Sequence, residues 1–296
     1  MDASTFYSAT FYAAIVLPFA VCVLLAPLER AFPRRAGQRP PARRWRVNMA
    51  LAAGATGLAV AAGVWATPWL GAAGARTGLF SLAALDIPAP LKFAAGLLAI
   101  DLMMFGLHIL SHRSGLLWRL HRVHHSDDEF DASTGLRHHA LEGLFNVCVL
   151  TFCHGLLGMP FAVIAVYGVA SAAHSALSHA NIAVPARVDR VLRLFIVTPD
   201  MHRLHHSADE REYNANYGQI FPWWDWIFRT LAAKPVTMQE KMQLGLKSDA
   251  IMAKASALQL TLSPFKNSSI VAAPMVAIPS ARRNRPSGPK RKRRVP

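Results

Sequence analysis

Long apolar stretches dominate the first two thirds of the chain. Residues 6–28 carry no charged side chain, and residues 48–70 are rich in Ala, Gly, Leu and Val. Residues 90–110 contain Lys92 near their start and one charge in their interior, Asp101. Because a helix that crosses a bilayer needs about 20 mainly apolar residues, each stretch predicts one membrane helix. Before the first stretch the chain holds Asp2 and no Lys or Arg, which favours a retained helix over a cleaved signal peptide.

A fourth apolar region, residues 144–177, is too long for one helix. Gly158, Met159 and Pro160 interrupt it, and a proline inside a helix removes a hydrogen bond and clashes with the preceding turn. The region therefore predicts two helices joined as a hairpin, the first of them short for a full crossing. Together with the earlier stretches, this indicates an all-α integral membrane protein with about four to five membrane helices.

The distribution of basic residues predicts how these helices are oriented. Seven arginines lie within residues 30–46, whereas residues 71–89 contain only Arg76. Because basic loops stay on the cytoplasmic side, the loop after the first helix is expected to be cytoplasmic. The regions that then face the cytoplasm are residues 29–47, residues 113–142 and everything after about residue 179, with the N-terminus outside.

Composition narrows the class of protein. Hydrophobic residues make up 53% of the chain and charged residues 17%, which disfavours a soluble enzyme. The net charge of +15 arises from the seven arginines above and from eight basic residues between 282 and 294. The remainder is neutral, whereas a nucleic-acid-binding domain would need basic and aromatic residues on a folded groove. We therefore expect no nucleic-acid partner.

The histidines carry the strongest chemical signal. All 13 lie between His108 and His206, and many are three or four residues apart, which places them on one face of a helix. Eight of them form three motifs: HxxxH at His108 and His112, HxxHH at His121, His124 and His125, and HxxHH at His202, His205 and His206. One ion of four to six ligands cannot use eight imidazoles, so converging motifs predict two metal ions.

Further residues near the motifs are candidates for the same site. His139, His174 and His179 could complete a coordination sphere, whereas His138 is a weaker candidate and His154 is interpreted as a core residue. Five side chains could orient the imidazoles by hydrogen bonding: Asp131, Glu142, Asp200, Asn216 and Asp225. Asp127 and Asp128 are interpreted as solvated cytoplasmic charges. Trp118, Trp223, Trp224 and Trp226 suit either interfacial anchors or packing of a cytoplasmic cap.

Four stretches of this sequence match a known family. They are HILSH at 108–112, HRVHHSDDEFDASTGLRHHALE at 121–142, HSALSHAN at 174–181 and MHRLHHSADEREYNANYGQIFPWWDWIFRT at 201–230. These stretches closely resemble the fatty acid hydroxylase superfamily, often called the sterol desaturase family, and in particular its bacterial members. The resemblance covers roughly residues 90–235 and is specific because HxxHH recurs inside longer matching context.

The resemblance implies a multi-pass enzyme of the bacterial inner membrane, with the histidine motifs in a cytoplasmic helical cap. Such enzymes hold a non-haem di-iron centre and use O2 to hydroxylate or desaturate a lipid or sterol C–H bond. The ligand roles carry over to the eight motif histidines and extend to His139 and His179. Three regions follow: residues 1–89 with N-terminal membrane helices and the Arg-rich loop, residues 90–245 as the catalytic domain, and residues 246–296 as a basic, disordered tail.

The expected chemistry requires partners. Imidazole suits iron, copper, nickel and zinc alike, so iron is implied by the resemblance rather than by the ligands. The chain has no GxGxxG fingerprint, no CxxC pair and no haem or flavin signature. We therefore expect an external electron donor of the ferredoxin, rubredoxin or cytochrome type, and a lipid or sterol substrate that enters from the bilayer.

Two other functions are compatible with the histidines. A histidine-rich metal-binding or metal-transporting membrane protein would place ionisable ligands near the bilayer midplane, where the sequence offers Asp101 and His154. A zinc hydrolase acting on lipids would need fewer ligands, an open water position and a carboxylate base.

Overall fold

The computed structural model describes residues 3–36, 42–77, 82–247 and 250–266. Within these ranges the protein is helical and contains no strand. Two isolated bridges, Pro33 with Ile182 and Ser207 with Leu244, are the β-type pairings in this part of the chain. The expectation of an all-α fold is therefore confirmed for the described residues.

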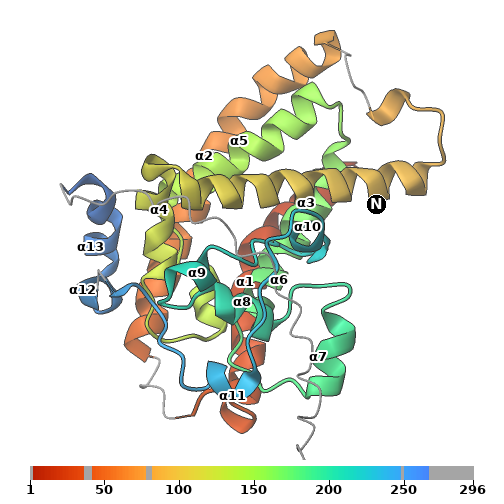
Figure 1. The fold of residues 1–296 in the computed structure, drawn as a ribbon. Coiled ribbons are helices and arrows are strands. Elements are labelled where there is room, and N and C mark those ends of the chain that lie inside the picture. Colours follow the sequence, from red (N-terminus) through yellow and green to blue (C-terminus); the bar gives the residue numbers. More distant parts are fainter. Residues whose placement is uncertain (1–2, 37–41, 78–81, 248–249, 267–296) are drawn as a thin grey trace, which may run out of the picture.

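The helices follow one another along the whole described chain (Figure 1). In the first half they are α1 (Ala3–Ala31), α2 (Ala42–Thr77), η1 (Leu82–Ala84), α3 (Ala89–Arg113), α4 (Gly115–His125), η2 (Ala132–Leu136) and α5 (Ala140–Leu156). The second half contains α6 (Phe161–Ser178), α7 (Ala186–Leu192), α8 (Pro199–His205), α9 (Glu210–Tyr213), α10 (Trp223–Ile227), α11 (Val236–Gln239), α12 (Ala250–Ala253), α13 (Ala257–Leu262) and η4 (Ser263–Phe265).

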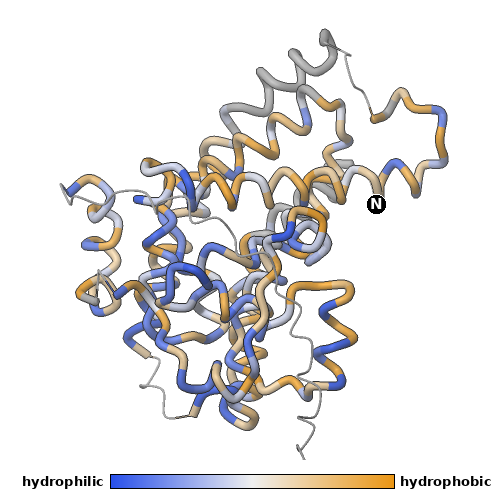
Figure 2. Tube along the Cα trace, in the orientation of Figure 1, coloured by the Kyte–Doolittle hydropathy of each residue, from blue (hydrophilic) through white to orange (hydrophobic). Residues whose placement is uncertain are grey.

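The long helices are arranged as two pairs and a crossing helix. Helix α2 packs along α5, α1 packs along α6, and α3 runs across both pairs (Figure 1). Helices α3 and α6 are long and apolar enough to cross a membrane, and α5 contains a shorter apolar segment. Figure 2 shows that hydrophobic residues concentrate in these long helices, whereas hydrophilic residues concentrate around α4, α8 and α9. This uneven distribution supports a membrane protein.

The predicted hairpin break is present between α5 and α6. Helix α5 ends at Leu156, Gly158 has a φ of 56°, and Pro160 precedes the first residue of α6. A positive φ is readily adopted by glycine, and proline at a helix start loses no helical hydrogen bond. Ile100 and Met104 of α3 pack with Cys153 of α5 and Val163 of α6 in one buried cluster. This cluster holds the hairpin against α3.

The C-terminal part differs from the expectation of a disordered tail from residue 246 onward. Residues 250–266 form short helices, and the buried side chains of Met252 and Leu260 pack against Leu51 and Val123. These apolar contacts order a segment whose sequence shows no clear periodicity. The basic residues between 282 and 294 lie outside the described residues.

Candidate metal centre

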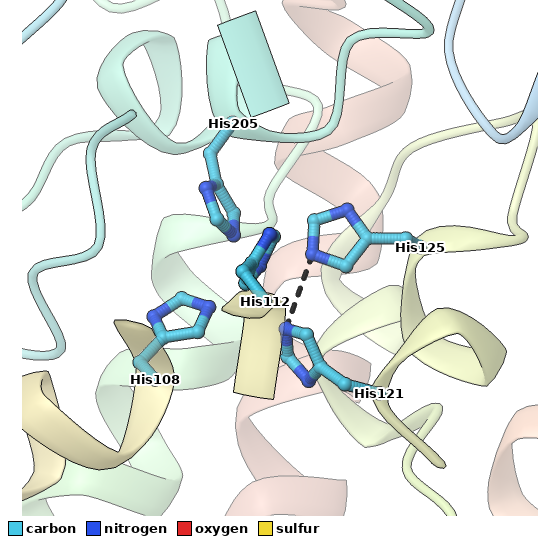
Figure 3. Close-up of side chains that lie close together, drawn as sticks. All are labelled: His108, His112, His121, His125 and His205. Atoms are coloured by element: carbon cyan, nitrogen blue, oxygen red, sulfur yellow. Dashed lines mark hydrogen bonds between the residues drawn. The ribbon is translucent and has the colours of Figure 1, made fainter. Parts of the chain in front are cut away.

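Nine buried histidines gather into two clusters. Within each cluster, one ring nitrogen of every member lies within 4.8 Å of those of the others. The first cluster contains five residues, His108, His112, His121, His125 and His205, and the second contains four, His124, His179, His202 and His206. Figure 3 shows the first cluster, with its five rings gathered around a common centre. The clusters include all eight motif histidines together with His179.

Helical spacing explains how the motifs are divided. Residues four apart lie one turn above each other, so His121 and His125 of α4 share one cluster. His124, three residues after His121, belongs to the other cluster. In the second HxxHH motif the assignment is reversed. His202 and His206, four residues apart, belong to the second cluster, and His205 belongs to the first. Each HxxHH motif therefore supplies both clusters, which places the two clusters side by side.

Hydrogen bonds set the proton positions in the first cluster. The Nδ1 of His108 lies 2.8 Å from the carbonyl oxygen of Tyr217, and the Nδ1 of His205 lies 2.7 Å from that of Ala215. Because a carbonyl oxygen only accepts, these Nδ1 atoms carry hydrogen and the Nε2 atoms keep their lone pairs. Both Nε2 atoms are buried and have no hydrogen-bond partner among the described residues. Such donor atoms fit a metal ion, whose histidine ligands typically donate their second N–H in this way.

Glu142 makes the carboxylate contact of the first cluster. Its Oε1 lies 2.6 Å from the Nδ1 of His121, which leaves the His121 Nε2 facing the Nε2 of His125 at 3.1 Å (Figure 3). Its Oε2 lies 3.2 Å from the Nδ1 of His138. His138 in turn stacks on His124, with ring centroids 4.3 Å apart. Glu142 thus holds a ligand of one cluster and supports a ligand of the other through His138.

The second cluster brings four Nε2 atoms together around His179. The Nε2 of His179 lies 3.2 Å from that of His124, 3.1 Å from that of His206 and 2.9 Å from that of His202. The Nδ1 of His179 lies 2.7 Å from the carbonyl oxygen of Ser175, so its Nε2 carries the lone pair. Several lone pairs at this spacing repel one another, and a bound cation would convert that repulsion into attraction.

Burial keeps these imidazoles neutral. Loss of hydration lowers the pKa values of His125, His205 and His206 well below the usual range, and the neighbouring histidines lower them further. Burial likewise lowers the pKa of His179 to about 3. A neutral imidazole is the form that binds a metal ion. The chain therefore offers deprotonated ligands without needing to release protons at neutral pH.

His139 and His174 lie outside both clusters. The Nδ1 of His139 accepts a hydrogen bond from the backbone N–H of Leu141 at 3.1 Å, and its Nε2 donates to the carbonyl of Thr261 at 3.0 Å. Both ring nitrogens are thus occupied, and the side chain caps α5. His154, expected to be a core residue, contacts the carbonyl of Met159 at 2.8 Å and closes the α5–α6 hairpin.

The other candidate orienting residues act through the backbone. Asp225 accepts hydrogen bonds from the backbone N–H of Tyr217 and Gly218 at 2.9 and 2.8 Å, and so fixes the carbonyl that holds His108. Asn216, which has a φ of 57°, donates to the carbonyl of Met201 at 3.0 Å. Asp131 caps η2 through Ser133. These residues shape the loops beside the ligands.

The Arg-rich loop, which the sequence presents as a basic stripe, binds the ligand-bearing segments. Arg34 makes two contacts with Asp200, at 3.1 and 2.9 Å, and Asp200 also pairs with Arg203 at 2.5 Å. Asp200 lies in the first turn of α8, two residues before His202. These ion pairs are largely shielded from solvent, because the side chains of Asp200 and Arg203 are at most 1% exposed.

A second arginine of the same basic segment, Arg44 in the first turn of α2, corrects the interpretation of Asp127. Arg44 contacts Asp127 at 3.1 Å and Asp131 at 2.5 Å, and Asp127 is 1% exposed rather than solvated. The opposite charge of Arg44 and that of Arg137 help to hold the pKa of Asp127 below its usual range despite burial. Sequence reasoning missed this pair, although an acid placed two residues after His125 could have drawn attention to it.

A cavity of about 1200 Å3 reaches the clusters from the apolar side. Histidines of both clusters, including His108 and His124, line one part of it, together with Glu142. Residues of α1, α2, α5 and α6, such as Leu150 and Ile164, line the remainder. Because these walls are mainly hydrophobic, the cavity fits a large apolar ligand.

Comparison with known proteins identifies the central part of this arrangement. Residues 93–230 match the family model described as fatty acid hydroxylase. The chain is 30% identical over 148 residues to ornithine lipid hydroxylase OlsE of Rhizobium tropici, which covers 50% of this chain and 44% of that protein. It is also 30% identical over 138 residues to the alkylglycerol monooxygenase of Caenorhabditis elegans, covering 45% of this chain and 26% of that protein.

The human alkylglycerol monooxygenase is 26% identical over 159 residues, covering 53% of this chain and 33% of that protein. The chain therefore spans less than half of the length of these relatives. No solved structure gives a significant match. The matched segment nevertheless contains all nine clustered histidines and the Asp225 loop.

Proposed function

Through residues 93–230 the chain belongs to the fatty acid hydroxylase superfamily, and we propose that it is a membrane-bound, O2-dependent di-iron oxidoreductase that hydroxylates or desaturates a lipid or sterol C–H bond. The observation that carries this proposal is the pair of all-histidine clusters at the end of a hydrophobic cavity. The relatives OlsE and alkylglycerol monooxygenase bear the names of lipid-oxidising enzymes.

The ligand assignment follows the two clusters. We assign one iron to the five histidines of the first cluster and the other to the four of the second. His139 and His174 are left out, since the first has both ring nitrogens engaged and neither lies within a cluster. A bound di-iron centre supplies the O2-dependent oxidising power that an unactivated C–H bond requires.

The chain's own residues prepare the site. Glu142 and the carbonyls of Tyr217, Ala215 and Ser175 hold the Nδ1 protons, which fixes the rings and turns each Nε2 inward. The hydrophobic walls exclude water and orient an alkyl chain toward the clusters. A lipid would enter from the bilayer, because the walls belong to the long apolar helices.

The proposal also includes the source of electrons and the location of the protein in the membrane. We propose an external one-electron donor of the ferredoxin, rubredoxin or cytochrome type, because the sequence carries no nicotinamide or flavin fingerprint. We also propose a multi-pass protein of the bacterial inner membrane with about four to five membrane helices, the N-terminus outside and the histidines in a cytoplasmic helical cap.

Metal transport receives no support from Asp101, the charge expected near the bilayer midplane. Its carboxylate accepts from the Tyr167 hydroxyl at 2.8 Å, from the Trp224 indole at 2.8 Å and from the backbone N–H of Ile220 at 3.2 Å. These bonds give the carboxylate a structural role in joining α3 and α6 to the loop before α10. A passing ion would have to displace several of them.

The test uses the full-length chain, purified without oxygen, loaded with iron and reconstituted in phospholipid bilayers. After chemical reduction and exposure to isotopically labelled O2, mass spectrometry is expected to find lipid that has gained labelled oxygen or lost two hydrogens. The double variant His124→Gln/His205→Gln, which removes one ligand from each cluster, should give no product. The matched control His139→Gln should retain activity. Product without O2, or equal product from the double variant, would refute the proposal.

A further inference from the structure

A surface with many exposed apolar side chains lies on α7, α10 and the residues that follow each of them. We call it the α7–α10 face, and its large hydrophobic side chains are 38–63% exposed. They are Val188, Val191, Leu194, Phe195, Trp226, Ile227, Phe228 and Leu231. A contiguous apolar patch of this kind normally marks contact with another molecule or with a membrane.

Hydrogen bonds join the two segments into one surface. The Trp223 indole at the start of α10 donates to the carbonyl of Leu194, just beyond α7, at 2.6 Å. Nearby, the backbone N–H of Val197 donates to the carbonyl of Ile220 at 2.9 Å. The apolar side chains after α7 and those of α10 are therefore held together as parts of a single face.

Contacts with α3 place this face at membrane depth. The Trp224 indole donates a hydrogen bond to Asp101, and the Phe228 ring stacks on Phe105 with centroids 5.5 Å apart. Figure 1 shows α10 next to α3. At 1.5 Å per residue, the 25-residue α3 is about 37 Å long, and Phe105 lies about 12 Å before its end at Arg113. A hydrocarbon core of about 30 Å centred on α3 would extend past both contacts. Figure 2 shows hydrophobic residues both along α3 and in the loop after α7.

Charged residues on the same face suit the boundary of a membrane. Arg187, Arg190 and Arg229 are exposed beside the apolar side chains, and Asp189 is paired with Arg193. Long arginine side chains can bury their stems in lipid and keep the guanidinium among phospholipid headgroups. Tryptophan, here Trp226 at 39% exposure, favours the same interface.

We propose that the α7–α10 face lies in the phospholipid bilayer beside α3, with its apolar side chains in lipid and its arginines at the headgroups. The segment after residue 179, expected in the cytoplasm, then returns to the membrane without crossing it. Such an element is monotopic, and its burial would fix the depth of the neighbouring loop that holds His108. The proposal depends on α3 crossing the membrane and holds whether or not the chain oxidises lipid.

Site-directed spin labelling of the full chain in phospholipid bilayers tests this placement. Cys148, the exposed native cysteine, is replaced by alanine, and a nitroxide is attached at Ile227→Cys. The matched control is Met238→Cys on α11, because the two native side chains are similarly exposed, at 63% and 56%. A second label at Phe195→Cys, where the native side chain is 58% exposed, samples the loop after α7 independently.

The expected result is that labels at 227 and 195 collide with dissolved O2 and are shielded from a water-soluble nickel chelate, whereas the label at 238 shows the reverse. Nickel access at 227 and 195 equal to that at 238 would overturn the proposal. So would strong dipolar broadening between labels at 227, because a second copy of the chain would then cover the face.

Discussion

The two histidine clusters share α4 and α8 but are stabilised in different ways. In the first cluster, three Nδ1 atoms are fixed by partners outside the ligand helices, namely Glu142 and the carbonyls of Tyr217 and Ala215. In the second, Ser175 fixes His179, while the Nδ1 atoms of His124, His202 and His206 lack partners among the described residues. The segments of the second cluster are instead held by arginines.

This difference separates two ways of preorganising a metal site. The first cluster controls the orientation of individual rings. The second takes two of its four ligands, His202 and His206, from α8 and its C-cap, and therefore depends more on how Asp200 and its arginines place this helix. Removing a ring partner should therefore affect the first cluster, and removing an ion pair should affect the second. The predictions below use that contrast.

Loss of a metal ligand should have the largest effect on lipid oxidation. The effect should be the same whichever cluster loses the ligand. Both His112→Gln and His206→Gln are expected to abolish lipid oxidation, because each removes a donor from one half of a two-metal centre. The measurement is product formation by the reconstituted chain, with His139→Gln as the control of unchanged activity. Substantial activity in either ligand variant would contradict a centre that needs both metals.

Breaking the arginine network should destabilise the fold and the second cluster together. Asp200→Ala leaves Arg34 and Arg203 without their shared carboxylate in a buried site, at a cost of about 3–5 kcal/mol. Thermal unfolding in detergent measures the loss, and metal analysis should show depletion at the second cluster first. An exposed acid, Glu240→Ala, serves as the control and should change neither quantity.

Removing the ring partner of His121 should act mainly on the first cluster, where Glu142 contacts a ligand directly, whereas it reaches His124 only through His138. Glu142→Ala is expected to weaken metal affinity by about 10–100-fold, because the His121 ring loses its orienting acceptor. Glu142→Gln keeps an acceptor and should cause a smaller loss. Metal titration of the purified chain measures both. Equal metal affinities of Glu142→Ala and the parent chain would contradict a role of Glu142 in orienting His121.

Acid should destabilise the metal-free chain. Burial lowers the pKa values of four clustered histidines in the fold, whereas unfolded histidines titrate near 6.5. These four are His124, His125, His202 and His205. Below pH 6.5 the unfolded chain binds more protons, so stability falls as the pH falls, by about 2 kcal/mol at pH 5 for each such histidine. Thermal unfolding at pH 7.5 and pH 5 checks this, and bound metal should reduce the difference.

Much of the site was predictable because its chemistry depends on local spacing. The i, i+3 and i+4 positions of His121, His124 and His125 place the rings correctly once a helix forms, and Pro160 marks the hairpin without any tertiary information. The division of the motifs between two clusters could not be predicted in the same way. It depends on how α3, α4 and α8 meet in space.

Long-range pairing explains what the sequence did not predict. Arg44 and Asp127 are separated by 83 residues and Arg34 and Asp200 by 166, so neither ion pair can be predicted from the local sequence. The contact of Trp224 with Asp101, 123 residues away, likewise places α10 beside α3, which the local sequence does not predict. The pattern of charged residues gives the sign of a segment's net charge, but it does not identify the residues with which the segment pairs.

The central claim is that two metals are held by two separate histidine clusters, and iron content per chain tests it most directly. After anaerobic purification and iron loading, the account predicts about two irons in the parent chain and in His139→Gln, and about one in each of His112→Gln and His206→Gln. A single zinc in the parent chain, or an iron content unchanged by both ligand variants, would contradict it.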